Sequence, residues 1–242
     1  MTDEAIPAAT LILVRDRAGA APEILMVERA ERMAFAAGAL VFPGGRIDAS
    51  DSDFAASIGT DGAIVAALRE TLEETAIPVG LSPTPDPAAA LDLQRQLLAG
   101  ASLCDLGIAL DPAALQPFAR WVPKFHAVRR FDTMFYVAAC PPGNWHPHVI
   151  EGECARAEWV AAAEVLGREQ RGEARLIFPT RRTLERLAQH SSIAAIRADA
   201  ASHPIEPISP WVEDHDGKNF ITIPDHLGFP VTREPLDGLW RG

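Results

Sequence analysis

The chain has 242 residues, of which 33 are acidic and 22 basic, so its formal charge at pH 7 is -11. This charge would repel a nucleic-acid backbone over most of the surface, so we expect no nucleic-acid partner. The longest apolar runs fall short of the roughly 18 residues that a membrane span needs, and the first ten residues lack a basic or apolar signal segment. Three cysteines without CxxC spacing indicate neither a disulfide framework nor a zinc site. We expect a folded cytoplasmic protein without membrane contact.

The first third of the chain predicts three strands and a helix. Residues 10–14 and 23–28 are short apolar runs around a turn-forming segment and predict an antiparallel pair. A third strand, 39–42, leads into a proline and two glycines, which stop a strand and allow unusual backbone angles. Residues 61–77 carry small and apolar residues at helical spacing and predict a helix that ends near Pro78.

The rest of the chain predicts an insert, further strands and helices, and an extended tail. We expect an insert over about 78–117, which contains an amphipathic helix at 88–98. Strands are predicted at 130–139 and 157–160, and a helix at 179–190.

This order predicts an α/β fold, with one domain over 1–202. The tail, 203–242, is rich in proline and contains a strand-like piece at 220–223. We expect it to pack on the same domain as a C-terminal extension.

Three glutamates form the strongest chemical signal. Glu70, Glu73 and Glu74 have the spacing i, i+3 and i+4, which places their carboxylates on one side of the predicted helix. A solvated acidic helix face would show the same spacing. A hard cation such as Mg²⁺ or Mn²⁺ would offset the repulsion between the carboxylates, because these ions prefer oxygen ligands. Arg69 could hold one of them through a charge-assisted hydrogen bond.

The surrounding residues decide between these interpretations. Residues 42–45 (FPGG), Arg69-Glu70, Glu73-Glu74 and Ile77 resemble the Nudix box, G-x5-E-x7-R-E-U-x-E-E-x-G-U, in which U is aliphatic. The resemblance implies an α/β/α sandwich with a mixed sheet. It also implies metal-dependent hydrolysis of a diphosphate linkage in a small nucleotide-derived substrate.

The sequence departs from the box at several positions. Gly45 and Arg69 are about ten residues further apart than the pattern allows, which lengthens the loop between them. Asp51 stands at the expected distance for the first acidic residue, with Asp48 and Asp53 as rivals. Ala76 replaces the closing glycine and should tolerate a left-handed helix cap poorly, so we expect Pro78 to end the helix by another route.

A longer similarity, over roughly residues 8–190, indicates a branch of the family. Residues 28–30, 38–48 and 129–133 resemble the branch that includes peroxisomal coenzyme A diphosphatases. The arginine of that branch's coenzyme A signature falls at Ala34 here, and Arg32 lies two positions earlier. Coenzyme A or its esters, ADP-ribose and dinucleotides therefore all stay open as substrates.

The resemblance also implies roles for individual residues. The metal ligands would be Glu70, Glu73, Glu74, Asp51 and the backbone of Gly44. Arg69 would orient Glu70, and Glu153, or alternatively Glu151, would act as the general base.

For the substrate, we expect phosphate contacts from Arg29, Arg46, Arg129 and Arg130, because guanidinium groups suit phosphate geometry. A structural salt bridge is the competing role for the last two. Phe35 would contact a base. For the loop with Trp145, His146 and His148 we favour packing over ligand binding.

Two other classes of protein fit the same sequence. Ala76, the displaced acidic position and the long insert motivate a Nudix-fold module that senses a nucleotide without cleaving it. A purely structural acidic domain would bind no metal. The proline-rich tail could support a homodimer.

Overall fold

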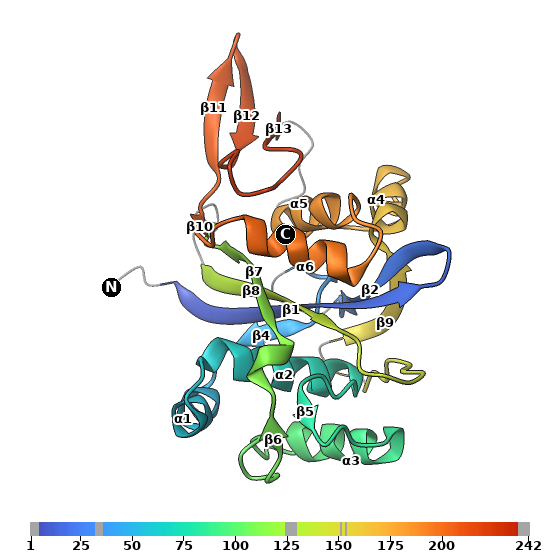
Figure 1. The fold of residues 1–242 in the computed structure, drawn as a ribbon. Helices are drawn as coiled ribbons and strands as arrows, with labels where there is room; N and C mark the ends of the chain where they lie inside the picture. Colours follow the sequence, from blue (N-terminus) through green and yellow to red (C-terminus); the bar gives the residue numbers. More distant parts are fainter. Residues whose placement is uncertain (1–4, 32–35, 124–129, 151, 153, 237–242) are drawn as a thin grey trace.

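The computed structural model describes residues 5–31, 36–123, 130–150, 152 and 154–236. A large mixed sheet lies between two layers of helices (Figure 1). Its strands are β1 (Ile6–Arg17), β2 (Ala20–Arg29), β3 (Leu40–Val41), β4 (Gly44–Arg46), β7 (Gln116–Trp121), β8 (Phe131–Ala139), β9 (Cys154–Ala161) and β10 (Pro207–Ile208). The expected α/β class with a mixed sheet is confirmed.

The helices divide into two groups by their place in the chain. They are α1 (Ala49–Ile58), α2 (Gly62–Thr75), α3 (Pro87–Leu98), α4 (Ala162–Gln170), α5 (Phe178–Leu187), α6 (Ile193–Ser202) and a short 3-10 turn, η1 (Pro112–Ala114). The described residues also contain two small sheets. They contain β5 (Leu81–Ser82) with β6 (Ala109–Leu110), and β11 (Trp211–His215) with β12 (Lys218–Thr222) and β13 (Arg233–Pro235).

Strand β1 is the centre of the main sheet. Along one edge its residues 6–14 pair in parallel with the whole of β8. Its other edge is shared between β4, which pairs with residues 8–10, and β2, which pairs with residues 14–17, both antiparallel. The edge therefore splits between two partners, and β4, which carries the diglycine, lies directly beside the first half of β1.

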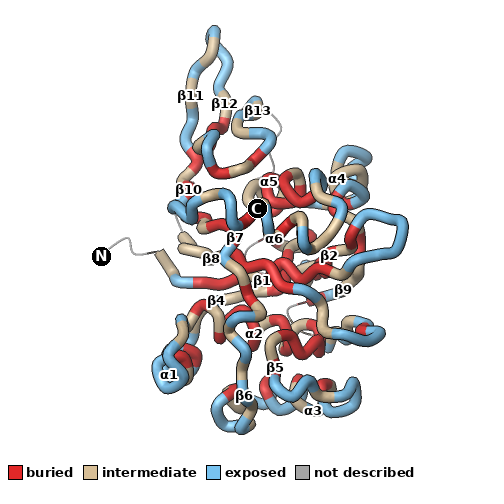
Figure 2. The backbone as a smooth tube through the Cα atoms, viewed as in Figure 1, coloured by how far each residue is buried: buried red, intermediate tan, exposed pale blue. Residues whose placement is uncertain are grey.

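The alternation of side chains along β1 explains the two helical layers. Leu11 and Leu13 point to the side of α2, whereas Ile12 and Val14 pack with residues of α4, α5 and α6 on the other side. Both faces are buried, which is why this strand is an unbroken apolar run in the sequence (Figure 2).

Helix α2 is also covered on two sides. Ala63, Ala66 and Ala67 pack on the sheet, whereas Val65 and Leu72 pack against α1, α3 and the small β5–β6 sheet. Small residues let the helix approach the sheet closely, and the longer residues fill the space beneath the insert. The acidic helix is thereby fixed between the sheet and the insert.

Several predicted elements are confirmed, and others were missed. The strands predicted at 10–14, 23–28, 130–139 and 157–160 correspond to β1, β2, β8 and β9, and the helices predicted at 61–77, 88–98 and 179–190 correspond to α2, α3 and α5. The prediction of a lengthened loop between the diglycine and the acidic helix was wrong, because most of that segment folds as α1.

The tail contributes to the main core and also extends away from it. Ile223, Leu227 and Phe229 are buried in the cluster formed with α4, α5 and α6. Strand β10 joins the main sheet at β7, and the β11–β12 hairpin projects from the body (Figure 1). The domain boundary at residue 203 stays a prediction. Among the described residues, no helix is both long and apolar enough to cross a membrane.

Candidate active site

Helix α2 begins and ends with clear caps. The Asp61 side chain accepts a hydrogen bond from the backbone N–H of Ala63 at 2.8 Å. At the other end Ala76 adopts a left-handed conformation with φ of 57°, and its N–H bonds to the Leu72 carbonyl. The expectation that the helix would end by another route is therefore wrong. Alanine takes the place and the left-handed conformation of the glycine, and the surrounding packing offsets the energetic cost of this conformation.

The diglycine is required by two close approaches. The Gly44 backbone, with φ of +155°, lies against the β1 backbone at Ala9 and Thr10, where a side chain would collide. A Cβ atom on Gly45 would overlap the Glu70 carboxylate. The Gly44 N–H also donates to Glu74 Oε2 at 3.0 Å. The bend therefore touches two of the three predicted carboxylates.

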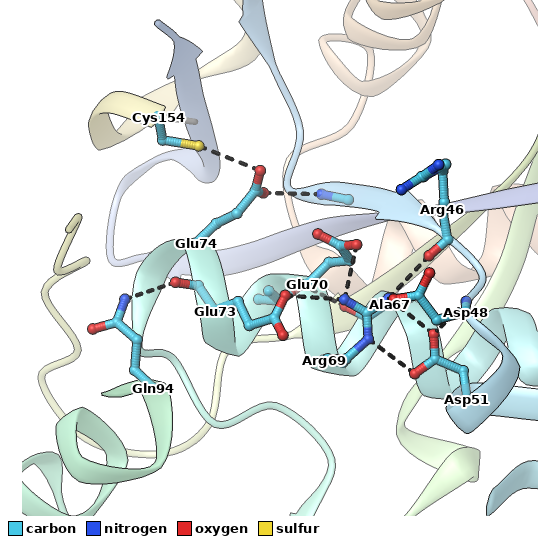
Figure 3. A network of polar contacts seen from close by, with 12 residues as sticks. Arg46, Asp48, Asp51, Ala67, Arg69, Glu70, Glu73, Glu74, Gln94 and Cys154 are labelled. Atoms are coloured by element: carbon cyan, nitrogen blue, oxygen red, sulfur yellow. Dashed lines mark hydrogen bonds and ion pairs between the residues drawn. The ribbon is translucent and has the colours of Figure 1, made fainter. Parts of the chain in front are cut away.

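Arg69 organises the acidic face of α2. Its guanidinium is nearly buried, with 6% of the residue exposed. It donates to Asp51 through two bonds of 2.9 and 2.8 Å, to Glu70 and Glu73 at 2.9 Å each, and to the Arg46 carbonyl at 2.9 Å (Figure 3). Burial alone would lower the pKa of Arg69, but the bond to Asp51 and the charges of Glu70 and Glu73 outweigh it and raise the pKa.

Of the three candidates for the first acidic residue of the Nudix box, Asp51 is the one that packs against the acidic helix, through Arg69. Asp51 lies in the first turn of α1, is 2% exposed, and accepts the Asp48 N–H in a capping box. The rival Asp53 is exposed, and Asp48 approaches Arg69 only to 3.8 Å. Both Asp51 oxygens accept hydrogen bonds from Arg69, as Glu70 and Glu73 also do, and the role of Asp51 as a metal ligand stays a prediction.

The Glu74 carboxylate lies in a desolvated part of this face. Burial, together with the negative charge of Glu70, raises the pKa of Glu74 to about 8. The Cys154 thiol donates to Glu74 Oε1 at 3.3 Å, and Arg29 acts on the same carboxylate through its charge. Glu70 and Glu74 are therefore close enough to repel each other, and both lie beside the diglycine.

Glu73 is directed differently from the other two. Its carboxylate pairs with Arg69 along the helix (Figure 3). Burial raises the pKa of Glu73, although the charge of Arg69 opposes the rise. Of the three, Glu70 and Glu74 therefore lie beside the diglycine, while Arg69 holds both Glu70 and Glu73.

The predicted substrate residues are only partly placed. Arg29 ends β2, and Arg46 ends β4 with an exposed side chain. Arg130 directly precedes β8, and its carbonyl accepts the N–H of Ile6 at the start of β1. Arg46 and Arg130 thus lie on the two neighbours of β1, near its beginning. The predictions for Glu151, Glu153, Arg129 and Phe35 fall outside the described residues.

Two residues that contact the acidic helix were not predicted as part of the site. No role in the site was predicted for Cys154, and its position beside Glu153 was the one available signal. Gln94, on α3, donates to the Glu73 backbone carbonyl at 2.9 Å, and no motif indicated it. For the loop with Trp145, His146 and His148, packing stays a prediction: Trp145 is buried, whereas His146 and His148 are exposed, and the His148 ring contacts Gln94.

The donor set suits a hard divalent cation. Glu70 and Glu74 offer carboxylate oxygens against a bend that leaves no room for a side chain, and oxygen donors are what Mg²⁺ and Mn²⁺ prefer. Within the described part of the chain, no three acidic, histidine or cysteine side chains already converge as a complete ligand set. The residues present therefore fit a cation that is held partly by this pair.

The fold and the site together resemble those of Nudix proteins: a mixed sheet between helices, with the glutamate-bearing helix against a diglycine bend. A Nudix hydrolase from Alicyclobacillus acidocaldarius has the same fold, with a TM-score of 0.69 and 28% sequence identity over 86% of this chain and 100% of its own. That similarity supports membership of the Nudix hydrolase superfamily.

Other solved structures are more distant. The NUDIX domain of Shewanella oneidensis NrtR, in complex with ADP ribose, is 15% identical over 78% of this chain and 88% of its own, with a TM-score of 0.48. The MutT protein from Methanosarcina mazei Go1 is 16% identical over 78% and 96%, with a TM-score of 0.44. No protein-family model and no curated protein matches the chain.

Proposed function

We propose that the chain is a metal-dependent pyrophosphohydrolase of the Nudix type, acting on a nucleoside diphosphate joined to a second group. The observation that carries the proposal is the pair Glu70 and Glu74, held together beside the diglycine although their charges repel. A protein gains nothing in stability from such a pair, so a bound cation is the simplest reason for it.

Mg²⁺ or Mn²⁺ would be held by Glu70 and Glu74, with Glu73 and the Gly44 carbonyl as further contacts. Bound there, the ion supplies charge neutralisation at the diphosphate and a water of lowered pKa. Arg69 fixes the position of Glu70 and Glu73 through hydrogen bonds of 2.9 Å. The Gly44 N–H fixes the orientation of Glu74.

The other residues of the site would hold the substrate and move a proton. Arg29, beside Glu74, and the exposed Arg46 would bind the phosphates, together with Arg129 and Arg130. Glu153 directly precedes Cys154 in the sequence, and the Cys154 thiol contacts Glu74, which supports Glu153 as the general base.

The sensor without catalysis was the second hypothesis, motivated by Ala76, the displaced acidic position and the long insert. Two of these features are accommodated: Asp51 pairs with Arg69, and Ala76 keeps the left-handed cap. The carboxylate pair is unaffected by both, which supports a hydrolase over the sensor.

The direct test is to incubate the full chain with coenzyme A, ADP-ribose and a dinucleoside polyphosphate, each with Mg²⁺ or Mn²⁺, and to identify products by mass spectrometry. We expect two phosphomonoesters from at least one substrate, and no product after chelation of the metal. Absence of product from every substrate with both metals would overturn the proposal. Calorimetric binding without product would instead support the sensor.

A variant pair ties the activity to this site. Glu74→Gln should lower kcat by roughly a hundredfold or more, because even groups that only support metal ligands contribute tenfold to a hundredfold. Glu164→Gln is the matched control, since Glu164 pairs with Arg168 and Arg171 on the exposed face of α4. Equal rates for both variants would remove Glu74 from the metal site. A homodimer and a cytoplasmic location stay predictions.

A further inference from the structure

Gln94 is a polar residue of the insert that hydrogen-bonds to the acidic helix α2. It lies on α3, and none of its surface is exposed. Its Nε2 donates to the Glu73 carbonyl at 2.9 Å and to the His148 carbonyl at 2.8 Å. Its Oε1 lies 2.9 Å from Nδ1 of the His148 ring. One buried amide thus joins three segments: the insert, the end of α2 and the loop that follows β8.

The orientation of this amide follows from its partners. Two carbonyl oxygens face one end of the side chain, so that end must be the NH₂ group, because an amide oxygen there would meet two acceptors. The other end is then an acceptor, and His148 Nδ1 must carry a hydrogen to donate to it. Every polar atom of the Gln94 side chain is therefore used.

The contacts fall on the carbonyls that a helix end leaves without partners. The last turn of an α-helix has carbonyls with no intrahelical N–H to bond. In α2 the Leu72 carbonyl accepts from Ala76, the Glu73 carbonyl from Gln94, and the Thr75 carbonyl from the backbone N–H of His148 at 2.8 Å. The insert and the loop therefore complete the turn from which Glu73 and Glu74 project (Figure 3).

We propose that Gln94 is a positioning residue, which, with His148, clamps the last turn of α2 and so fixes Glu73 and Glu74 for the reaction. The proposal rests on the proposed function for its effect on catalysis. A cap made by the end of the helix alone would let this turn fray, as helix ends do. With the clamp, the insert controls the direction of the two carboxylates although it contributes no group to the reacting atoms.

The test compares Gln94→Leu with two controls on the same helix. Gln94→Leu keeps a similar volume and removes both donors. Leu97→Ala opens a cavity in the cluster with Val65 and Leu72, so it destabilises the insert without touching the clamp. Gln96→Glu places a charge on an exposed position of α3. Amide hydrogen exchange and steady-state kinetics are measured for each at a temperature where all remain folded.

We expect the amides of Ala76 and His148 to exchange faster in Gln94→Leu by about tenfold, and kcat to fall by about tenfold to a hundredfold with little change in KM. Gln94→Glu, which turns an oxygen toward two carbonyls, should behave in the same way. Leu97→Ala and Gln96→Glu should leave both quantities near wild type. The proposal is overturned if Gln94→Leu exchanges and reacts like Leu97→Ala.

The two measurements, amide hydrogen exchange and kinetics, distinguish a failure of the clamp from a failure of the proposed function. If wild-type protein hydrolyses nothing, the function fails, but exchange at Ala76 and His148 still reports whether the clamp exists. If the wild type is active and Gln94→Leu is equally active with unchanged exchange, the clamp alone fails.

Discussion

The buried pair of Arg69 and Asp51 gives the most demanding prediction for stability. The change is Asp51→Asn, which keeps the shape of the side chain and removes its charge. Arg69 donates two bonds to Asp51, of 2.9 and 2.8 Å, and both residues are at least nine-tenths buried. Removing one partner of such a pair costs about 3–5 kcal/mol.

Arg69 keeps three other acceptors after the change, namely Glu70, Glu73 and the Arg46 carbonyl. The remaining asparagine oxygen also accepts one bond. We therefore expect the lower part of the range, a loss of about 2–4 kcal/mol in the free energy of unfolding. Urea unfolding followed by tryptophan fluorescence and circular dichroism measures it. A chelator is present throughout, so that a metal-ligand role of Asp51 would contribute nothing.

The control is Asp92→Asn in the exposed pair with Arg95, whose side chains are 62% and 64% exposed at 3.2 Å. It should change stability by less than about 0.5 kcal/mol. A double-mutant cycle with Arg69→Met should give a coupling free energy above about 1.5 kcal/mol. The reasoning is refuted if Asp51→Asn costs no more than the control, or if the two changes in the cycle are additive.

Three further changes follow from particular contacts. Gly45→Ala should reduce kcat/KM by about a hundredfold in the hydrolysis assay with little loss of stability, because the new methyl group displaces Glu70; wild-type kinetics would contradict the close approach. Ala76→Gly should raise the free energy of unfolding by about 0.5–1 kcal/mol, because glycine relieves the left-handed strain at φ of 57°; a lower melting temperature would count against it. Burial, opposed by Arg182, raises the pKa of Glu185 from 4.5 to about 7, so the folded protein loses stability as pH rises through that interval. As the pH rises from 5 to 8, the free energy of unfolding of Glu185→Gln should therefore increase relative to that of wild type by up to roughly 3 kcal/mol, measured by urea unfolding. A difference independent of pH would exclude this cause.

Local patterns were enough to predict the parts of the fold with strong periodicity. The apolar run at 10–14 predicted a strand, and burial on both faces explains why it lacks polar residues. Helix α2 was predicted at 61–77 and is observed at Gly62–Thr75, because the small and apolar residues recur every turn and Asp61 caps the start.

Helix α1 was missed because it lacks that periodicity. Only Asp51 and Ala55 of its residues are buried, so its sequence has almost no apolar face. Its stability comes from a capping box at Asp48 and from the ion pair to Arg69, which lies 18 residues later. A contact between distant residues leaves no trace in the pattern of the segment itself.

The site shows the same division. The spacing of Glu70, Glu73 and Glu74 predicted a shared helix face, but their different partners depend on the positions of Gly44, Cys154 and Arg69 in space. Gln94 could not have been singled out, because a glutamine on an amphipathic helix gives no sign of the carbonyls that it will meet.

The parallel pairing of β1 with β8 has a consequence for synthesis of the chain. Ile6 pairs with Phe131, roughly 125 residues later, and the pairing continues to Ala139. On the ribosome, the first strand therefore keeps one edge of backbone N–H and C=O groups unpaired until β8 has emerged. Strand β4, which carries the diglycine, is synthesised early, but the sheet that supports it is complete only after β8 has paired. Nascent chains halted before β8 should therefore be the form that chaperones bind.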